Sequence, residues 1–365
     1  MKMLFLIPTL GGGGSERVLS IIANFLCEEN DIEVLLLERP KKIAYEIDNR
    51  VKIKWPNVVT PHGNKLKTVL NYIKNIRSLK NFINGEISNL NPDVILSLLP
   101  KADMLAYLCK KDKAAWISSE RNDPWSRNSF ERLFLNHIYK KTDLLICQTN
   151  VVKDYYANQG VKNTLVIRNP LSIKLQSIGE QFEYDDFMVC VGRLDPQKNY
   201  LMLIKAFYDL KSETPISTKL LILGEGPQRK EIMQTIQQHH LENDVILLGR
   251  KDNVGDYLHK AKFFVMSSDY EGLPNSLIEA MCCGLPVICT DFRTGAGREL
   301  VDENNGFLVK VNDLIGMKAA LKAMLEKNKT QLQNMGSSSL KKVDSLSMDI
   351  ICNQWKRAIW GAVEK

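Results

Sequence analysis

Residues 267–290 read SSDYEGLPNSLIEAMCCGLPVICT, the most informative stretch of the chain. The apolar run Phe263–Met266 before it predicts a buried strand, and a helix is expected to begin near Pro274. Glu271 lies in the intervening loop, and Glu279 follows inside the helix after seven further residues. Because parallel strands present their carboxyl ends at one edge, both carboxylates are expected to face one ligand cleft.

Glu279 is an acidic residue in an otherwise apolar helix. Burying an unpaired carboxylate costs roughly several kcal/mol, so Glu279 needs a partner. Two adjacent ribose hydroxyls would supply hydrogen bonds, and an ion pair with a neighbouring Lys or Arg is the plainer alternative. Backbone amides around Asn275 and Ser276, at the predicted helix N-terminus, are expected to hold a phosphate.

Working outward, short apolar runs alternate with amphipathic helices, which predicts parallel strands covered by helices on both faces. The runs begin at Met3, Ile32, Asp93, Ala114 and Asp143, and again at Phe187, Lys219, Asp244, Lys262 and Pro286. The pattern breaks over 169–185, which begins with Asn-Pro. We expect two α/β domains, residues 1–168 and 185–345, and a C-terminal helix, residues 346–365, that packs back on the first domain.

Four consecutive glycines, residues 11–14, follow the first predicted strand and precede a helix opening with Ser15-Glu16-Arg17. Glycines let the backbone approach a ligand, and the helix N-terminus offers unpaired N–H groups to an anion. A tight strand–helix turn is the alternative interpretation. The dinucleotide fingerprint G-x-G-x-x-G fails, because Glu16 and Arg17 occupy the positions where its last glycine would stand.

The second domain opens with VGRLDPQKN, in which Arg193 and Lys198 lie just past a predicted strand. Two cations at a strand's carboxyl end suit a diphosphate leaving group, whose negative charge grows in the transition state. A solvated loop with ordinary surface charges is the alternative.

Composition and charge limit the classes of function that remain possible. The net charge of +7 is concentrated in residues 1–175, which hold 26 Lys and Arg against 17 Asp and Glu. A basic half suggests an anionic partner. The eight cysteines form no C-x-x-C pair and predict buried thiols in a reducing compartment. No apolar run reaches the length of a membrane span, so a cytoplasmic protein is expected.

Taken together, the Glu-x7-Glu segment, the G-R-L-x-x-x-K-N run and the glycine turn resemble the family 4 retaining glycosyltransferases, of the kind that builds bacterial surface polysaccharides such as capsule or O-antigen. That resemblance implies the α/β GT-B fold, in which two Rossmann-like domains with parallel sheets face each other across an interdomain cleft. It also implies transfer of a sugar from a nucleotide-sugar, by default a UDP-sugar, to a glycan acceptor.

The resemblance also implies roles for individual residues. Arg193 and Lys198 would bind the donor diphosphate, Glu271 would face the hydroxyls of the transferred sugar, and Glu279 would hold the ribose. The remaining donor-binding candidates are Gly13, Gly14, Asn253, Val254, Leu273, Pro274, Asn275 and Ser276.

The chain departs from the family pattern in one place. Many relatives carry a His near the sugar, whereas the matching stretch here is ISSERNDP, with Glu120, Arg121 and Asn122 as acceptor-side candidates. Arg121 is a candidate for the histidine's place. No metal motif of the D-x-D type is present, so we expect a metal-independent, retaining transfer without a cofactor, in which Arg193, Lys198 and Glu271 are catalytic.

The acceptor side is indicated by Lys65–Leu90, which reads as a long amphipathic helix with a basic face. Contact with an anionic membrane surface would suit a polyprenyl-diphosphate-linked glycan and a peripheral location at the inner face of the plasma membrane. A core helix with a solvated basic face is the alternative.

Two other functions stay open at this point. A nucleotide-sugar epimerase can share the fold, although no carboxylate or His pair is assigned to proton abstraction. A non-catalytic nucleotide-sugar binding protein is the other. Nucleic acid is not an expected partner, because no basic motif with interleaved aromatics appears.

Overall fold

The computed structural model describes residues 1–56, 65–109, 113–171 and 185–364, with the side chains of residues 65–74 left out of the description. The chain divides into two compact units. Unit 1 comprises Met1–Pro170 and Met348–Lys365, and unit 2 comprises Leu171–Ser347.

Unit 1 is built on a seven-stranded parallel sheet with the order β3-β2-β1-β4-β5-β6-β7. The buried strands are almost wholly apolar, as expected for a sheet covered on both faces. The strands are β1 (Lys2–Ile7), β2 (Asp31–Leu36), β3 (Lys52–Lys54), β4 (Val94–Leu98), β5 (Ala115–Ser119), β6 (Leu144–Cys147) and β7 (Thr164–Val166).

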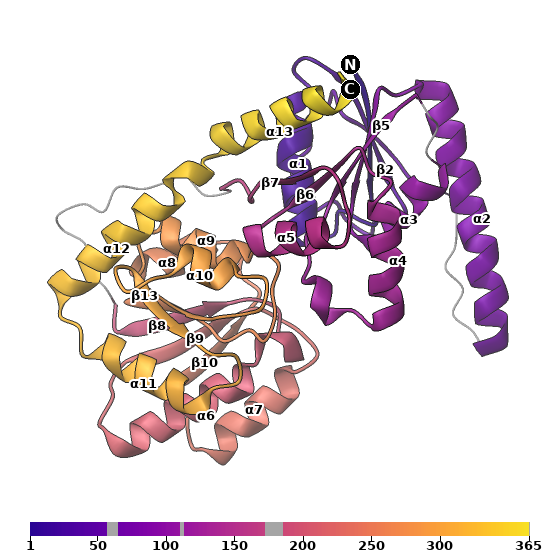
Figure 1. Ribbon diagram of the computed structural model, residues 1–365. Helices are drawn as coiled ribbons and strands as arrows, with labels where there is room; N and C mark the ends of the chain where they lie inside the picture. Colours follow the sequence, from indigo (N-terminus) through magenta and orange to yellow (C-terminus); the bar gives the residue numbers. More distant parts are fainter. Residues whose placement is uncertain (57–64, 110–112, 172–184, 365) are drawn as a thin grey trace. The chain divides into compact units, whose positions relative to one another are not determined.

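Helices cover both faces of this sheet (Figure 1). Apolar side chains of α2, α3, α4 and α5 form one core with the strands. The helices before the linker are α1 (Gly14–Leu26), α2 (Lys65–Leu90), α3 (Pro100–Cys109), α4 (Ser129–Tyr139) and α5 (Asn150–Asn158), with a 3₁₀ turn at Pro124–Ser126.

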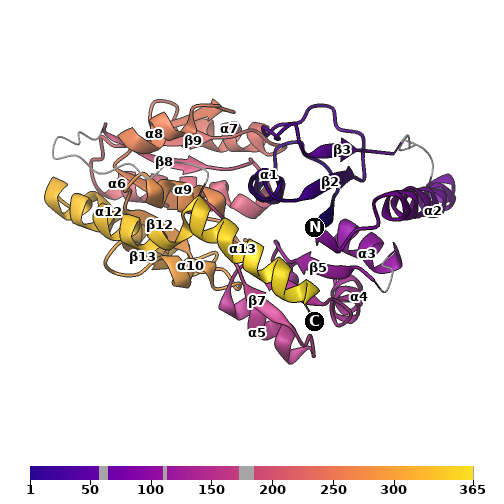
Figure 2. The same cartoon turned by 90° about the horizontal axis from the view of Figure 1, so that it is seen from above.

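The last helix, α13 (Met348–Val363), belongs to unit 1 although it follows unit 2 in the sequence. It contacts α1 and β5, and Figure 2 shows it beside α1. Its apolar stripe includes Ile351, Trp355 and Ile359, all fully buried. Lys356 adds an ion pair with Glu29, three residues beyond the end of α1.

Unit 2 repeats the architecture with a six-stranded parallel sheet in the order β10-β9-β8-β11-β12-β13. Its strands are β8 (Phe187–Val191), β9 (Lys219–Leu223), β10 (Val245–Gly249), β11 (Phe263–Met266), β12 (Val287–Thr290) and β13 (Gly306–Val309). Its helices are α6 (Tyr200–Glu213), α7 (Arg229–Gln238), α8 (Val254–Lys260), α9 (Asn275–Cys282), α10 (Ala296–Leu300), α11 (Leu314–Leu325) and α12 (Lys329–Val343), with 3₁₀ turns at Pro196–Lys198 and Asp344–Leu346.

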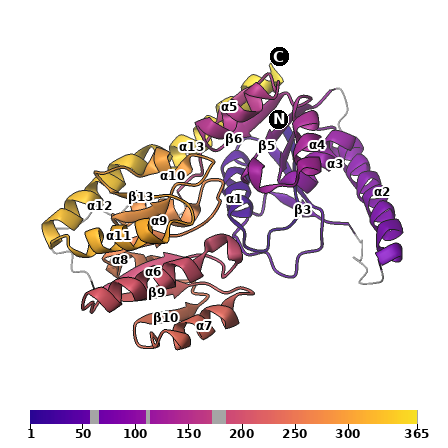
Figure 3. The same ribbon diagram turned by 60° about the horizontal axis from the view of Figure 1, so that its bottom comes forward.

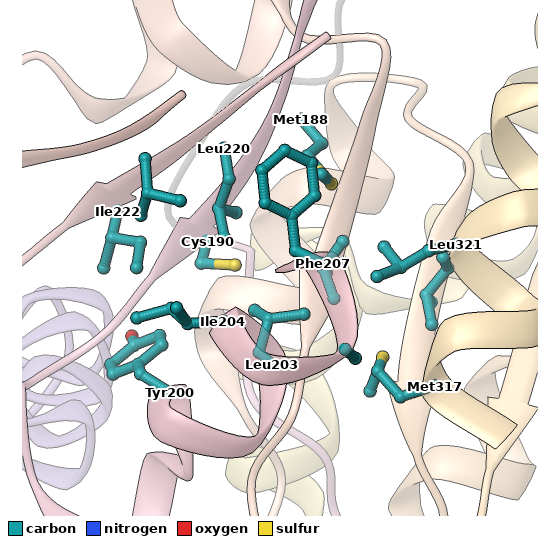
Figure 4. Packing of buried hydrophobic residues seen from close by; sticks show 14 of the residues in the cluster. Met188, Cys190, Tyr200, Leu203, Ile204, Phe207, Leu220, Ile222, Met317 and Leu321 are labelled. Carbon is teal, nitrogen blue, oxygen red and sulfur yellow. The ribbon is translucent and has the colours of Figure 1, made fainter. Parts of the chain in front are cut away.

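The core of unit 2 lies between α6, α11 and the central strands (Figures 1 and 3). Figure 4 shows Phe207 of α6 pointing toward the strand side chains, with Leu321 of α11 beside it. Met188 and Cys190 of β8 complete the contact from the sheet. This packing fixes the strand ends on which the candidate site is built.

The structure confirms the ten predicted strands and the predicted helix Lys65–Leu90. It adds β3, β7 and β13, which the sequence analysis did not predict. These strands are three or four residues long, and β3 and β7 form the two edges of their sheet. Within the described part of the chain, no helix has both the length and the apolar content needed to cross a membrane.

Candidate functional site

The two loops that carry the predicted donor-site charges follow adjacent strands of unit 2. Strand β8 lies in the middle of the sheet, between β9 and β11. The chain adds β9 and β10 on one side of β8, and then returns to add β11, β12 and β13 on the other side. Parallel α/β sheets bind ligands at such a topological switch point, outside the carboxyl ends of the strands. Lys198 follows β8 and Glu271 follows β11.

Lys198 and Glu271 meet directly. The Lys198 Nζ lies 2.6 Å from Glu271 Oε1, and the two side chains are 16% and 12% exposed. Ser268 Oγ donates a second hydrogen bond to the same carboxylate oxygen, at 2.9 Å. The structure therefore brings together two of the three predicted catalytic residues as a partly buried ion pair.

Arg193, the third predicted catalytic residue, is far more exposed. Its guanidinium pairs with Asp195 of the same loop at 2.9 Å, and its side chain is 77% exposed. It shares the carboxyl edge of the sheet with Lys198 because both follow β8.

Two glycines allow the loop after β8 to lie this close to its neighbours. A Cβ on Gly192 would stand 2.9 Å from Lys198 Cε and 3.0 Å from the Tyr200 hydroxyl. Gly224 has a φ of +153°, and a Cβ there would stand 1.8 Å from the Gly192 carbonyl oxygen. A side chain at Gly192 would push the Lys198 side chain aside, and one at Gly224 would displace the backbone of the loop that carries Lys198.

The helix α9 begins at the position predicted from the sequence. Pro274 precedes its first residue and supplies no side-chain hydrogen bond to the helix amides. Leu273 and Pro274 are buried, whereas Asn275 and Ser276 are half-buried at the helix start. Glu279 lies on the same helix and is 8% exposed.

Asn253 and Val254 lie after β10, at the start of the short helix α8. Asn253 is exposed, and its side-chain amide donates to Asp256 at 2.8 Å. Both residues are placed at the same sheet edge as the Lys198 and Glu271 loops, because each follows a carboxyl end.

The glycine turn of unit 1 lies after β1, at the switch point between β1 and β4. The amides of Gly12 and Gly13 have a partner within the turn itself. They donate to Glu16 Oε2 at 2.6 and 2.9 Å, because the acidic side chain of the first helical turn folds back over the loop. Gly13 precedes α1 as its N-cap residue, and Gly14 is the first residue of the helix.

Glu120 lies in a buried network rather than on an open surface. Its carboxylate accepts two hydrogen bonds of 2.6 Å from Arg127 and one from the Tyr156 hydroxyl, also 2.6 Å. It accepts a further bond, of 3.0 Å, from the amide of Asn122, whose side chain is exposed. Burial alone would raise the pKa of Glu120, but the charge and hydrogen bonds of Arg127 lower it overall. These contacts fit a role in fixing the loop.

Arg121 is buried, and among the residues that the structure describes no carboxylate accepts a hydrogen bond from it. Its guanidinium donates to Ser119 Oγ at 3.3 Å and to Asn169 Oδ1. Burial lowers the pKa of Arg121 to about 9, and the nearby charge of Glu120 opposes that shift. Of the three predicted acceptor-side residues, only Asn122 has an exposed side chain.

Asp103 is a buried carboxyl that the sequence analysis missed. It accepts hydrogen bonds from the hydroxyls of Ser97 and Ser118 at 2.7 Å and from Tyr139 at 2.8 Å. Burial raises the pKa of Asp103 to about 7, although these hydroxyls oppose the shift. No periodic signal identifies it, because its partners lie on three different elements.

No group of three or more His, Cys, Asp or Glu side chains is placed to hold a metal ion among the residues that the structure describes.

Comparison with known proteins agrees with this geometry. The family described as Glycosyltransferase Family 4 matches residues 12–174, and the one described as Glycosyl transferases group 1 matches residues 174–341. A Campylobacter jejuni enzyme, N-acetylgalactosamine-N,N'-diacetylbacillosaminyl-diphospho-undecaprenol 4-alpha-N-acetylgalactosaminyltransferase, is 30% identical over 90% of this chain and 91% of its own. An amylovoran biosynthesis glycosyltransferase of Erwinia amylovora is 26% identical over 86% of this chain and 90% of its own.

Among solved structures, Anabaena HepE in complex with UDP and glucose matches with a TM-score of 0.78, at 17% identity, over 99% of this chain and all of the other. The fold, with its two parallel-sheet units, is that of the GT-B glycosyltransferases. The chain belongs to glycosyltransferase family 4, as its 30% identity to the Campylobacter enzyme and the match of its residues 12–174 to the family show.

Proposed function

We propose that this glycosyltransferase moves a sugar from a UDP-sugar to a polyprenyl-diphosphate-linked glycan, with retention at the anomeric carbon and without a metal ion. The observation that carries the donor site is the Lys198–Glu271 pair at the switch point of the unit 2 sheet. Support for the nucleotide comes from HepE, whose structure holds UDP and glucose. Support for the acceptor comes from the Campylobacter enzyme, whose name includes diphospho-undecaprenol.

The proposed chemistry follows from the charges at this edge. The Lys198 ammonium and the exposed Arg193 guanidinium stabilise the diphosphate as it departs, where preorganised charge lowers the barrier most. Glu271 and Glu279 bind sugar and ribose hydroxyls, and the amides at the start of α9 bind phosphate oxygen. The departing phosphate oxygen takes the acceptor's proton, so no protein base is required.

The donor and the stereochemistry are tested together. Incubation with a panel of UDP- and GDP-sugars and a polyprenyl-diphosphate-linked glycan, with and without EDTA, is followed by nucleotide release and by NMR of the product. We expect UDP release, an α-linked product from an α-configured donor, and no effect of EDTA. An inverted product refutes retention, and isomerised UDP-sugar without transfer would show an epimerase.

Membrane contact is a separate part of the proposal. The basic helix α2 exposes Arg77, with Lys80 one turn further on and half-buried. We place it against anionic lipid at the inner face of the plasma membrane, the surface that presents a lipid-linked acceptor. Flotation with anionic vesicles at low salt is expected to carry the protein, whereas neutral vesicles are not; equal flotation on both would refute the electrostatic contact.

A further inference from the structure

The loops that carry Lys198 and Glu271 are bonded to each other at several points besides that ion pair. The amide of Asp269 donates to the carbonyl of Gln197 at 2.8 Å, and Ser267 Oγ donates to the carbonyl of Lys198 at 2.8 Å. These bonds hold Gln197 and Lys198 of one loop to Asp269 and Ser267 of the other, two and four residues before Glu271.

A side-chain bond between Asn199 and Asp269 closes the same contact. Asn199 Nδ2 donates to Asp269 Oδ1 at 2.7 Å and to Asn312 Oδ1 at 2.6 Å. Asn199 precedes α6, yet its side chain makes no capping bond to that helix. The side-chain amide bonds to the neighbouring loop and not to the helix that follows it.

The backbone conformation of Asn199 limits which residue types can make this bond. Its φ of +49° lies in the left-handed region, which favours glycine and which asparagine tolerates better than most residues. Glycine would satisfy the backbone but could not reach Asp269. Asparagine is therefore the residue type that satisfies both the turn after Lys198 and the bond to the neighbouring loop.

We propose that Asn199 and Asp269 are positioning residues that hold Lys198 and Glu271 within hydrogen-bond distance of each other. This inference rests on the proposed donor site. When the donor binds, Lys198 exchanges Glu271 for diphosphate oxygen and Glu271 turns to sugar hydroxyls. The Asn199–Asp269 bond keeps the two loops together while their charged side chains change partners.

The test compares two asparagines with the same backbone conformation. Asn199→Gly keeps the left-handed turn and removes the bond to Asp269. Asn312→Gly, at a φ of +58°, removes only the other acceptor of the Asn199 amide. We expect Asn199→Gly to lower kcat about tenfold, with a smaller change in the donor KM and an unchanged melting temperature, because misplaced charge affects the transition state most. Asn312→Gly is expected to keep kcat within twofold.

Variants of Asp269, the acceptor of this bond, provide a second test. Asp269→Ala is expected to lower kcat as Asn199→Gly does, and Asp269→Asn, which keeps an acceptor oxygen, to restore most of it. The double variant Asn199→Gly/Asp269→Ala should be no slower than either single one. Equal losses in Asn199→Gly and Asn312→Gly, or kcat within twofold of wild type in Asn199→Gly, would overturn the inference. Failure of the proposed function looks different, because wild-type protein would then turn over no nucleotide-sugar.

Discussion

The two units share one architecture but use charge at their strand ends in opposite ways. In unit 1, Glu120 and Arg127 form an ion pair whose side chains are 1% and 5% exposed. In unit 2, Lys198 and Glu271 remain partly accessible, and Arg193 projects into solvent. The first arrangement fixes a loop, and the second leaves charges able to change partners.

Physical chemistry explains why the difference matters. A buried ion pair is costly to break, because either partner left alone keeps its desolvation penalty. The Lys198–Glu271 pair is more exposed, and Ser268 Oγ also donates to Glu271, so an incoming phosphate can replace the carboxylate at a smaller cost than in unit 1. The comparison therefore predicts that charge removal damages stability in unit 1 and turnover in unit 2.

The largest expected effect is on unit 1 stability. Arg127→Met leaves the Glu120 carboxylate buried without its main partner and should lower the free energy of unfolding by about 3–5 kcal/mol. Tryptophan fluorescence during urea denaturation reports it, because all five tryptophans lie in unit 1. Arg50→Met, which removes an exposed pair with Asp48, is the control and should change little. Equal losses in both would show that burial is not the cause.

The second effect is on turnover. Lys198→Ala should lower kcat about 10²–10³-fold, because a preorganised charge next to the leaving group is lost, while the melting temperature stays near wild type. Lys205→Ala removes a lysine paired with Asp209 on α6 and serves as the matched control. Steady-state kinetics with the donor that the nucleotide-sugar panel identifies decide the point, and a loss below threefold would exclude Lys198 from catalysis.

The smallest effect is a pH dependence located in unit 1. The pKa of Asp103 is about 7 in the folded chain because burial disfavours its charge, so the folded state binds the proton more tightly than the unfolded state. Stability should therefore fall as pH rises, by about 2 kcal/mol between pH 5.5 and 8.

Asp103→Asn removes the titrating group and keeps one of its two acceptor oxygens, so its free energy of unfolding should lack this part of the pH dependence. Urea denaturation of both proteins across the range measures the difference. Parallel pH profiles would mean that Asp103 stays ionised or stays protonated throughout.

Most of the fold could be predicted from the sequence, because long apolar strands and amphipathic helices have strong local periodicity. The strands β3, β7 and β13 could not be predicted, because β3 and β7 have only three residues and β13 begins with a glycine, a residue that is depleted in strands. The donor-site motifs were readable because each lies within one loop. The contact between those loops was not, because Asn199 and Asp269 are 70 residues apart.

Glu16 and Glu120 illustrate the other limit of sequence reasoning. The sequence identified both segments as ligand-facing, yet Glu16 caps its own glycine loop and Glu120 is held by Arg127 and Tyr156. The sequence shows the same acidic residue whether its carboxylate binds a ligand or a neighbouring backbone amide. Only the position of its hydrogen-bond donors separates the two.

Calorimetric titration with UDP tests whether Lys198 belongs to the donor site, since it measures donor-site binding apart from acceptor and turnover. Wild-type protein should bind UDP, and Lys198→Ala should raise the Kd for UDP about tenfold or more through loss of a charged hydrogen bond. Arg127→Met, measured where it is folded, should keep the wild-type Kd. Undiminished binding in Lys198→Ala together with lost binding in Arg127→Met would contradict the account.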